Sequence, residues 1–432
     1  MLAALTKLNA FLWGGPLLLL LLFIHLSFTI RTGFIQKKLP LALKLSVQSS
    51  GTANGEMSRF ASLSTLLAAT LGTGNIVGVS TAIAFGGPGA VFWCWLTGVL
   101  GMATSYAECY LGIAFRRHTA SGSYFGGPMV LWEDLLHRPL VAKLFCLFTI
   151  LASFGVGCST QARAVTEAAA STWSLPLLPV GLLLAGLVGL VLLGGAKAIG
   201  RICSLLVPLM GVFYLSACLF LLFCNISCLG AALRLIVTSA FSLRSVGGGV
   251  LGSSLLLAAR YGIARGLFTN EAGLGSAPIA AACGSVTTPQ SQSLVMMSAT
   301  FWDTVVMCGI TGLVIISSKL RFPAVFSGRS AGDYTSAAFS TLPFYGSELL
   351  SVAIIAFAVA TLIGWSFFGE KAAEYLFGSS VTVTYRFCYI FMIFLGSQLS
   401  LTLVWELCDF FNALMAVPNL VCLFLLRRRI KT

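Results

Sequence analysis

Two short stretches combine glycine with threonine and asparagine inside otherwise apolar runs, and their chemistry suits a small charged ligand. The first is LAATLGTGNIVGVST at 67–81, and the second, LFTNEAGLGSAP at 267–278, follows about 200 residues later. Glycine inside a helix costs up to about 1 kcal/mol relative to alanine, so each stretch predicts an interrupted helix. An unwound turn frees amide N–H groups for a carboxylate and carbonyl oxygens for a cation.

The composition of the 432-residue chain places it in a membrane. Hydrophobic residues make up 58% of it and charged residues only 9%, whereas soluble domains carry about 25% charged residues. The formal net charge is +13, and in membrane proteins such an excess usually comes from basic cytoplasmic loops. We therefore expect no nucleic-acid partner. Most of the 13 cysteines lie in apolar runs without a CxxC motif, which argues against a metal or redox role. Cys224 and Cys228 flank the end of one run and could pair.

Eleven segments are apolar and long enough to cross a bilayer, which takes about 20 residues. They fall at 12–31, 60–85, 89–114, 142–172, 177–195, 204–224, 248–286, 292–317, 348–376, 385–402 and 403–426. If the amino terminus is outside, 17 of the 26 lysines and arginines lie in cytoplasmic stretches and 6 in outer ones. This bias predicts an outer amino terminus and a cytoplasmic carboxyl terminus in the cell membrane. The first segment lacks a signal-peptide cleavage site and is expected to be retained.

The two glycine-rich stretches each open a block of five segments, and the predicted orientation gives the blocks opposite topology. Paired interruptions at corresponding positions of inverted halves indicate the binding site of a secondary transporter. Close helix packing is the alternative for either stretch alone, because small residues let membrane helices approach. The presence of two such stretches favours the transporter.

Longer motifs give the chain a family resemblance. They include NGEMSRFASLSTLLAATLGTGNIVGVSTAIAFGGPGAVFWCWLTGVLGMATSYAE, GIARGLFTNEAGLGSAP, TFWDTVVMCGITGLVI, ATLIGWSFFGEKAAEYLFG and DFFNALMAVPNL. With these motifs, in this order from about residue 28 to 425, the sequence resembles the alanine or glycine:cation symporters. That family has the leucine-transporter-like fold of the amino acid–polyamine–organocation superfamily.

The resemblance implies an all-α membrane protein with five-plus-five inverted repeats, broken first and sixth core helices, and alternating access. An extra amino-terminal helix precedes the ten core helices. The expected units are 1–45 for the extra helix and its basic flank, 58–228 for the first repeat, 229–247 for an outer interfacial helix and loop, 248–426 for the second repeat, and 427–432 for a basic cytoplasmic tail. The implied function is sodium-coupled uptake of alanine, glycine or similar small amino acids, without a cofactor.

The resemblance also implies roles for individual residues. The amides of the first interruption are expected to receive the substrate carboxylate, and aromatic side chains are expected to cap an apolar pocket. The residues assigned to the substrate are Leu71, Gly72, Thr73, Gly74, Gln161, Phe268, Gly273, Ser276 and Trp365. One sodium site is expected to use Thr70, Asn75, Thr269 and Asp303. A second is expected to combine carbonyls near Ala68 and Leu71 with the hydroxyl of Thr361.

Charged residues in the apolar segments raise further expectations. A carboxylate inside a span needs a partner, and a bound cation would serve Asp303. Arg265 and Asp409 lie at similar depth, so they are candidates for an ion-paired outer gate. Arg163 and Cys158 stand where the family usually has asparagine. Arg163 is expected either to pair with Glu167, one helical turn away, or to alter the substrate or ion preference.

Three other functions compete with sodium symport. A proton-coupled symporter of the same fold would use Asp303 or Glu271 as its titrating group. An intramembrane enzyme is disfavoured by the placement of the three histidines and by the lack of a nucleophile motif. A channel is disfavoured because opposed broken helices suit an occluded site. The sequence leaves open the preferred amino acid and enantiomer, the sodium stoichiometry and the oligomeric state.

Overall fold

The computed structural model describes residues 2–48, 55–119, 122–242, 254–286, 288–399 and 401–431, and they are mostly helical. The helices before residue 243 are α1 Leu2–Gly14, α2 Pro16–Arg31, α3 Leu39–Val47, α4 Arg59–Thr70, α5 Val77–Gly86, α6 Ala90–Ala114, α7 Pro128–Val130, α8 Pro139–Phe154, α9 Thr160–Trp173, α10 Leu177–Leu193, α11 Gly195–Cys224 and α12 Ile226–Ala240. The later helices are α13 Ser254–Asn270, α14 Ala277–Cys283, α15 Pro289–Thr300, α16 Gly309–Arg321, α17 Pro323–Phe326, α18 Tyr334–Phe339, α19 Gly346–Phe377, α20 Val381–Gln398 and α21 Leu401–Leu426. A short antiparallel hairpin pairs β1 Arg117–His118 with β2 Tyr124–Phe125.

Among the described residues, seven helices are long and apolar enough to cross a membrane. The bent pair Arg59–Thr70 and Thr73–Gly86 makes an eighth span if its two parts are counted together. The remaining expected spans coincide with the 17-residue α10, with α13 and α14, and with α20. The fold class is therefore confirmed, whereas the count of eleven spans stays a prediction.

The amino-terminal run differs from the expected single helix over 12–31. The helix is interrupted at Gly15, between the end of α1 at Gly14 and the start of α2 at Pro16. Proline lacks the amide hydrogen that a continuing helix would use, and it fits the first turn of a new helix. The run from Ala4 to Arg31 is nevertheless apolar along 28 residues.

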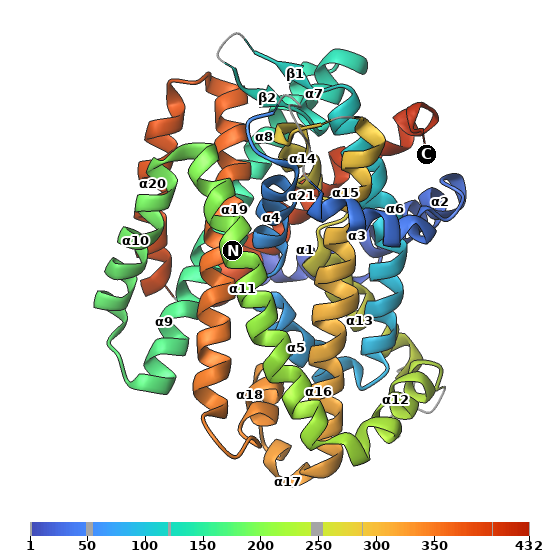
Figure 1. Ribbon diagram of the computed structural model, residues 1–432, viewed down its shortest axis with the longest axis vertical. Coiled ribbons are helices and arrows are strands. Elements are labelled where there is room, and N and C mark those ends of the chain that lie inside the picture. Colours follow the sequence, from blue (N-terminus) through green and yellow to red (C-terminus); the bar gives the residue numbers. More distant parts are fainter. Residues whose placement is uncertain are drawn as a thin grey trace.

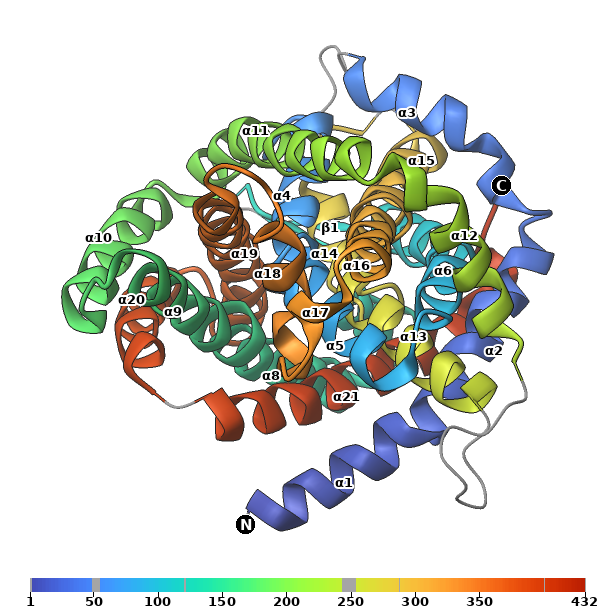
Figure 2. The ribbon, with the colours of Figure 1, turned by 90° about the horizontal axis from the view of Figure 1, so that it is seen from below.

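The broken helices occupy the middle of the bundle. Seen from below, α4, α5 and α14 lie inside a ring that includes α6, α11, α19 and α21 (Figure 2). The pair α10 and α20 forms one edge of the molecule, and α2 lies against α6 at the other (Figure 1). A break at this depth is buried by protein rather than exposed to lipid, which is where irregular backbone is tolerated in membranes.

Both predicted interruptions are present, and they lie beside each other. The chain bends by 59° between α4 and the segment that starts at Thr73, and a second gap of six residues separates α13 from α14. Helix α13 packs along α5, and α14 packs against α4. The division into repeats stays a prediction, because the end of 229–247 and the start of 248–426 fall outside the described residues.

Candidate functional site

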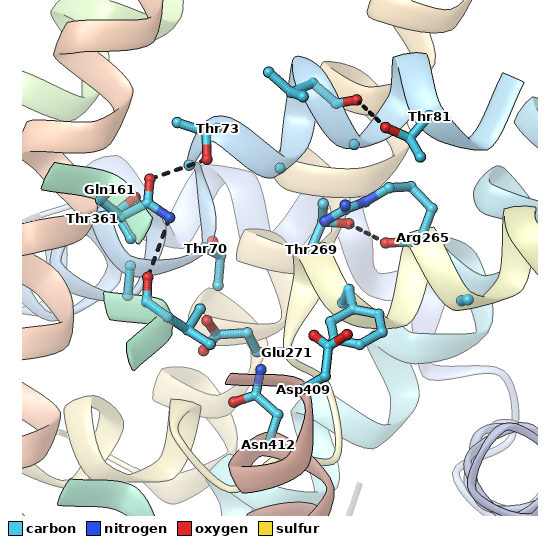
Figure 3. A pocket seen from close by; sticks show the side chains of 18 of the residues that line it. Thr70, Thr73, Thr81, Gln161, Arg265, Thr269, Glu271, Thr361, Asp409 and Asn412 are labelled. Carbon is cyan, nitrogen blue, oxygen red and sulfur yellow. Dashed lines mark hydrogen bonds between the residues drawn. The ribbon is translucent and has the colours of Figure 1, made fainter. Parts of the chain in front are cut away.

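A cavity of about 530 Å³ lies where the two broken helices meet. Its walls come from the first break, α5, α13, α19 and α21, together with residues near the start of α9. Figure 3 shows Thr73 with Gln161, Arg265 with Thr269, and Glu271, Asn412 and Asp409 around it. Eleven of the predicted site residues line this cavity: Thr70, Gly72, Thr73, Gly74, Gln161, Arg265, Phe268, Thr269, Thr361, Trp365 and Asp409.

The first break exposes backbone amides to the cavity. Helix α4 ends at Thr70, Gly72 is extended with φ −120° and ψ −168°, and a 3₁₀ turn covers Thr73–Asn75. The amides of Thr73 and Gly74 precede the first hydrogen bond of that turn, from the amide of Asn75 to the Gly72 carbonyl. Leading amides of a helical turn have no partner inside it and attract an anion.

The second break owes its shape to residues with left-handed backbone. Glu271, Gly273 and Gly275 have φ of 54°, 96° and 86°, respectively. Glycine adopts such angles without strain, whereas glutamate does so rarely. The carboxylate of Glu271 accepts hydrogen bonds from Trp365 Nε1 at 3.0 Å and Ser276 Oγ at 2.6 Å. Glu271 also lines the cavity, so Ser276 acts on the site through this carboxylate.

Asp303 lies at the centre of a buried oxygen cluster next to the cavity. It is fully buried on a π-helical turn, Phe301–Cys308, a deformation common at functional sites. Its carboxylate accepts hydrogen bonds from Asn75 Nδ2 and Thr304 Oγ1, both at 2.7 Å. The Thr304 hydroxyl lies 3.4 Å from that of Thr269, which lines the cavity. The cluster is therefore reached through Thr269.

Other oxygen atoms meet where α4 ends against α19. The Thr361 hydroxyl donates to the Leu71 carbonyl at 3.3 Å and to the Phe357 carbonyl at 3.0 Å. Gly364 permits this close approach, because a Cβ there would lie 2.5 Å from the amide nitrogen of Ala69 and 3.0 Å from the Ala68 carbonyl carbon. Thr70 is buried, and its hydroxyl has no hydrogen-bond partner among the residues that the structure describes. A cation can use such an oxygen atom.

Gln161 and Trp365 form another part of the cavity wall. Thr73 Oγ1 donates to Gln161 Oε1 at 3.2 Å, so the glutamine lies beside the exposed amides. A π-helical turn at Gly155–Ser159 precedes Gln161. Its Gly157 makes room for Trp365, since a Cβ at that position would overlap the Trp365 side chain. Trp365 is fully buried.

Six predicted residues lie outside the cavity wall. Asn75 and Asp303 belong to the adjacent oxygen cluster. The Leu71 carbonyl accepts a hydrogen bond from Thr361, and the Ala68 carbonyl carbon lies close to Gly364. The remaining two are Ser276, which supports Glu271, and Gly273. The Gly273 amide donates to the Glu108 carboxylate at 3.3 Å, and its carbonyl accepts from Asn419. Gly273 thus anchors the second break to α6 and α21.

The expected gate residues face the cavity without pairing. No ion pair joins Arg265 to Asp409 within the part of the chain that the structure describes. The Arg265 guanidinium instead lies on the bare backbone of Gly74 and Gly78, where a Cβ would overlap it. Among the described residues, this end of the cavity consequently has no closing ion pair.

A buried charge cluster closes the opposite end of the bundle. Lys371 Nζ contacts Glu56 Oε1 at 2.9 Å and Glu374 Oε2 at 3.2 Å. Glu374 also accepts from Ser123 Oγ, and Glu56 accepts from the amide of Tyr124. The cluster ties the segment before α4 to α19 and the β-hairpin. Removing one member of such a buried cluster leaves an uncompensated charge.

Two departures from the family pattern have structural explanations. Arg163 Nε pairs with Glu167 Oε1 at 2.8 Å, and Arg163 Nη1 donates to the Ser397 carbonyl, which confirms the expected pairing. Cys158 is buried with its thiol near the Tyr389 carbonyl, and neither residue lines the cavity. Cys224 and Cys228 are free thiols.

The site contains residues that the sequence interpretation did not assign to it. Glu271 was considered only as a proton carrier, while Thr304 and Asn412 were not singled out. Thr304 follows Asp303 directly, so its hydroxyl was a detectable signal. Asn412 lies one helical turn after Asp409 and lines the same cavity. The i, i+3 spacing of two polar residues in an apolar span could have indicated that both face the site.

Known proteins resemble the chain along its whole length. Residues 1–432 match the family model described as the sodium:alanine symporter family. The chain is 42% identical to the sodium/alanine symporter AgcS of Methanococcus maripaludis, over 97% of this chain and 93% of that protein. It is 41% identical to an uncharacterized transporter of Haemophilus influenzae, over 98% and 93%, respectively.

A solved structure shares the fold. The crystal structure of MhsT in complex with L-phenylalanine superposes with a TM-score of 0.61 at 16% identity, covering 86% of this chain and 89% of that one. The sequence motifs, the paired helix breaks and the full-length match agree, and the chain belongs to the sodium:alanine symporter family.

Proposed function

We propose that this transporter couples the uptake of a small neutral amino acid to sodium and works by alternating access. The observation that carries the proposal is the cavity between two broken helices, bordered by exposed amides on one side and by the Asp303 cluster on another. A zwitterion and a cation need this combination of donors and oxygen ligands. Family membership makes the chain a transporter rather than an enzyme.

The substrate carboxylate is proposed to bind the amides of Thr73 and Gly74, with Gln161 beside them. A glycine at position 72 avoids crowding beside this group, because a Cβ there would lie 2.9 Å from the Thr361 hydroxyl and 3.6 Å from Gln161 Oε1. Phe268 and Trp365 line the same cavity and are proposed to pack against the substrate side chain. Leu71, Gly273 and Ser276 shape the two breaks without lining the cavity.

Two sodium sites are proposed, and the distribution of oxygen atoms supports them. The first is proposed at Asn75, Thr269 and Asp303 of the buried cluster, together with Thr70 at the end of α4. The second is proposed at the carbonyls of Ala68 and Leu71 with the Thr361 hydroxyl. Hard cations prefer such oxygen ligands. Ala360 stands where the family usually has a serine, so Thr361 would be the hydroxyl ligand of the second site.

The cavity is proposed to face outward, with the amino terminus outside and the carboxyl terminus cytoplasmic. The basic tail Arg427–Arg429 supports the placement of the carboxyl terminus. The cavity extends along α5 and α13 through Val77, Thr81 and Tyr261, away from the Lys371 cluster. Rearrangement of the 58–228 and 248–426 units would open that cluster toward the cytoplasm.

Arg265 and Asp409 are proposed to pair when the outer end closes over the substrate. Each single charge reversal, Arg265→Asp or Asp409→Arg, is expected to lower alanine uptake about tenfold, because like charges then face one another. The double reversal is expected to restore most of the uptake, since coupled residues deviate from additivity. Initial uptake rates measure this, and a double variant no better than the single ones would contradict the gate.

Radiolabelled alanine and glycine uptake into proteoliposomes tests the function. With an inward sodium gradient we expect accumulation above equilibrium, and with choline replacing sodium we expect none at any pH. Uptake that persists in choline and follows a proton gradient would instead support the proton-coupled symporter, for which the buried Glu271 in the cavity wall provides a titrating group. Solute flux that only runs downhill, without accumulation, would indicate a channel.

A further inference from the structure

We infer that Trp13, on the helix that precedes the ten core helices, is a positioning residue that sets how large a substrate side chain the cavity accepts. It does so by packing against the Phe268 ring and donating a hydrogen bond to the Asp409 carbonyl, on the side of these residues away from the cavity. The inference rests on the proposed function, because it concerns the amino acid bound in the cavity.

Helix α1 presents one face to the core and another to the surroundings. Asn9 and Trp13, one turn apart, are 5% and 8% exposed, whereas Phe11 between them is 65% exposed. An apolar helix lying only in lipid would have no reason to bury an asparagine, because unpaired polar groups are costly there. The buried face of α1 therefore has specific partners.

Those partners lie on α21 at the point where it borders the cavity. Asn9 Nδ2 donates to the carboxylate and the carbonyl of Glu406, both at 2.7 Å. Trp13 Nε1 donates to the Asp409 carbonyl at 3.0 Å. The indole N–H is a donor only, so this hydrogen bond fixes the orientation of the ring as well as the position of α1 along α21 (Figure 2).

The same indole ring packs on the cavity wall. Its centroid lies 4.2 Å from that of the Phe268 ring, with an interplanar angle of 34°. Phe268 and Asp409 both line the cavity, and they come from α13 and α21, which are separate elements. Trp13 thus contacts two walls of the cavity from outside, and it fills the space into which Phe268 would otherwise tilt.

A second contact joins the amino-terminal helices to the same break. His25 on α2 is fully buried and its Nδ1 lies 2.8 Å from Thr104 Oγ1 of α6. Its Nε2 and the Nδ2 of Asn270 each lie 3.5 Å from the position of a Cβ at Gly101. Asn270 is the last residue of α13, two residues after Phe268. The amino-terminal helices therefore lie close to α13 both beside the cavity and at its break.

The physical consequence concerns substrate size. Removing the indole leaves an empty space behind Phe268, and the cavity on the other side can then expand as that ring moves. A hydrophobic pocket discriminates by about tenfold or more for each methylene it excludes, so a looser wall should reduce this discrimination. A merely structural role for Trp13 would lower the amount of folded protein without changing the preference among substrates.

The test compares Trp13→Ala, Trp13→Phe and the matched control Phe11→Ala, which removes an exposed ring from the same helix. Each is reconstituted, and KM and maximal rate are measured for alanine and for leucine as a larger neutral amino acid. Trp13→Ala is expected to lower the preference for alanine over leucine about tenfold through KM. Trp13→Phe should restore most of it, and Phe11→Ala should match the parent chain.

A double variant makes the role of Phe268 specific. If Trp13 acts through this ring, Phe268→Ala should change the preference by itself, and adding Trp13→Ala to it should have little further effect. An unchanged alanine-to-leucine preference in Trp13→Ala, or fully additive effects with Phe268→Ala, would overturn the inference. Absence of sodium-driven uptake in the parent chain would instead contradict the proposed function.

Discussion

Replacing Asp303 by asparagine is expected to reduce sodium-driven alanine uptake by about 100-fold or more. Leaving a buried charge without its partner costs about 3–5 kcal/mol, and the sodium ion loses such a partner when the carboxylate becomes an amide. The Asn75 and Thr304 donors would also face an amide that can accept at only one atom. We therefore expect the sodium concentration for half-maximal uptake to rise far above that of the parent chain.

The control for this substitution is Asp333→Asn, on the exposed connection before α18, where the carboxylate accepts a hydrogen bond from Ser330 Oγ. It removes the same charge from an exposed side chain outside the cluster and should leave the sodium dependence unchanged. Both variants are compared by initial uptake rates over a range of sodium concentrations, with the amount of reconstituted protein measured. If Asp303→Asn kept the parent's sodium dependence, the first sodium site would be placed wrongly.

Replacing Gly72 by valine is expected to abolish alanine uptake while leaving the protein folded. The extended backbone at Gly72 suits a β-branched residue, so the substitution introduces no backbone strain. A Cβ there would lie 2.9 Å from Thr361 Oγ1 and 3.6 Å from Gln161 Oε1. The larger valine side chain would occupy the proposed carboxylate position, and a displacement of about 1 Å in such a site can cost about 100-fold in rate.

Gly186→Val provides the matched control for this second prediction. Gly186 lies on the outer face of α10, and nothing approaches a Cβ there within 4 Å. This variant should transport alanine at the parent's rate. Alanine binding and thermal unfolding in detergent measure the two effects separately: Gly72→Val should lose binding but keep its unfolding temperature within a few degrees. Normal alanine affinity in Gly72→Val would argue against the carboxylate position.

The membrane character, most segment boundaries and both helix breaks could be predicted from the sequence, since each has a local cause. Apolar runs of sufficient length form spans, and clustered glycines weaken helices where they stand. The same holds for the Arg163–Glu167 pair, which follows from helical spacing. Eleven of the predicted residues lie on one cavity because the first break, which contributes four of them with the end of α4, lies beside α13, which contributes three.

Features that depend on contacts between distant segments could not be predicted in this way. The π-helical turn that places Asp303 and Thr304 has no sequence signal of its own, and the position of Arg265 over Gly74 and Gly78 depends on how α13 packs on α5. Trp13 looked like an ordinary apolar residue, since nothing in the first segment indicates its contact with Phe268. Gly273 matched a motif, yet its backbone is used by Glu108 and Asn419 rather than by the cavity.

The proposed function requires that alanine uptake is coupled to sodium at the two broken helices. The most direct test is the initial rate of alanine uptake into proteoliposomes as the external sodium concentration is varied. The membrane potential is held constant, and choline replaces sodium to keep the ionic strength fixed. If the proposed sites are correct, the uptake rate rises and saturates with sodium, and sodium lowers the KM for alanine. An alanine uptake rate and KM that are the same in sodium and in choline would contradict sodium coupling.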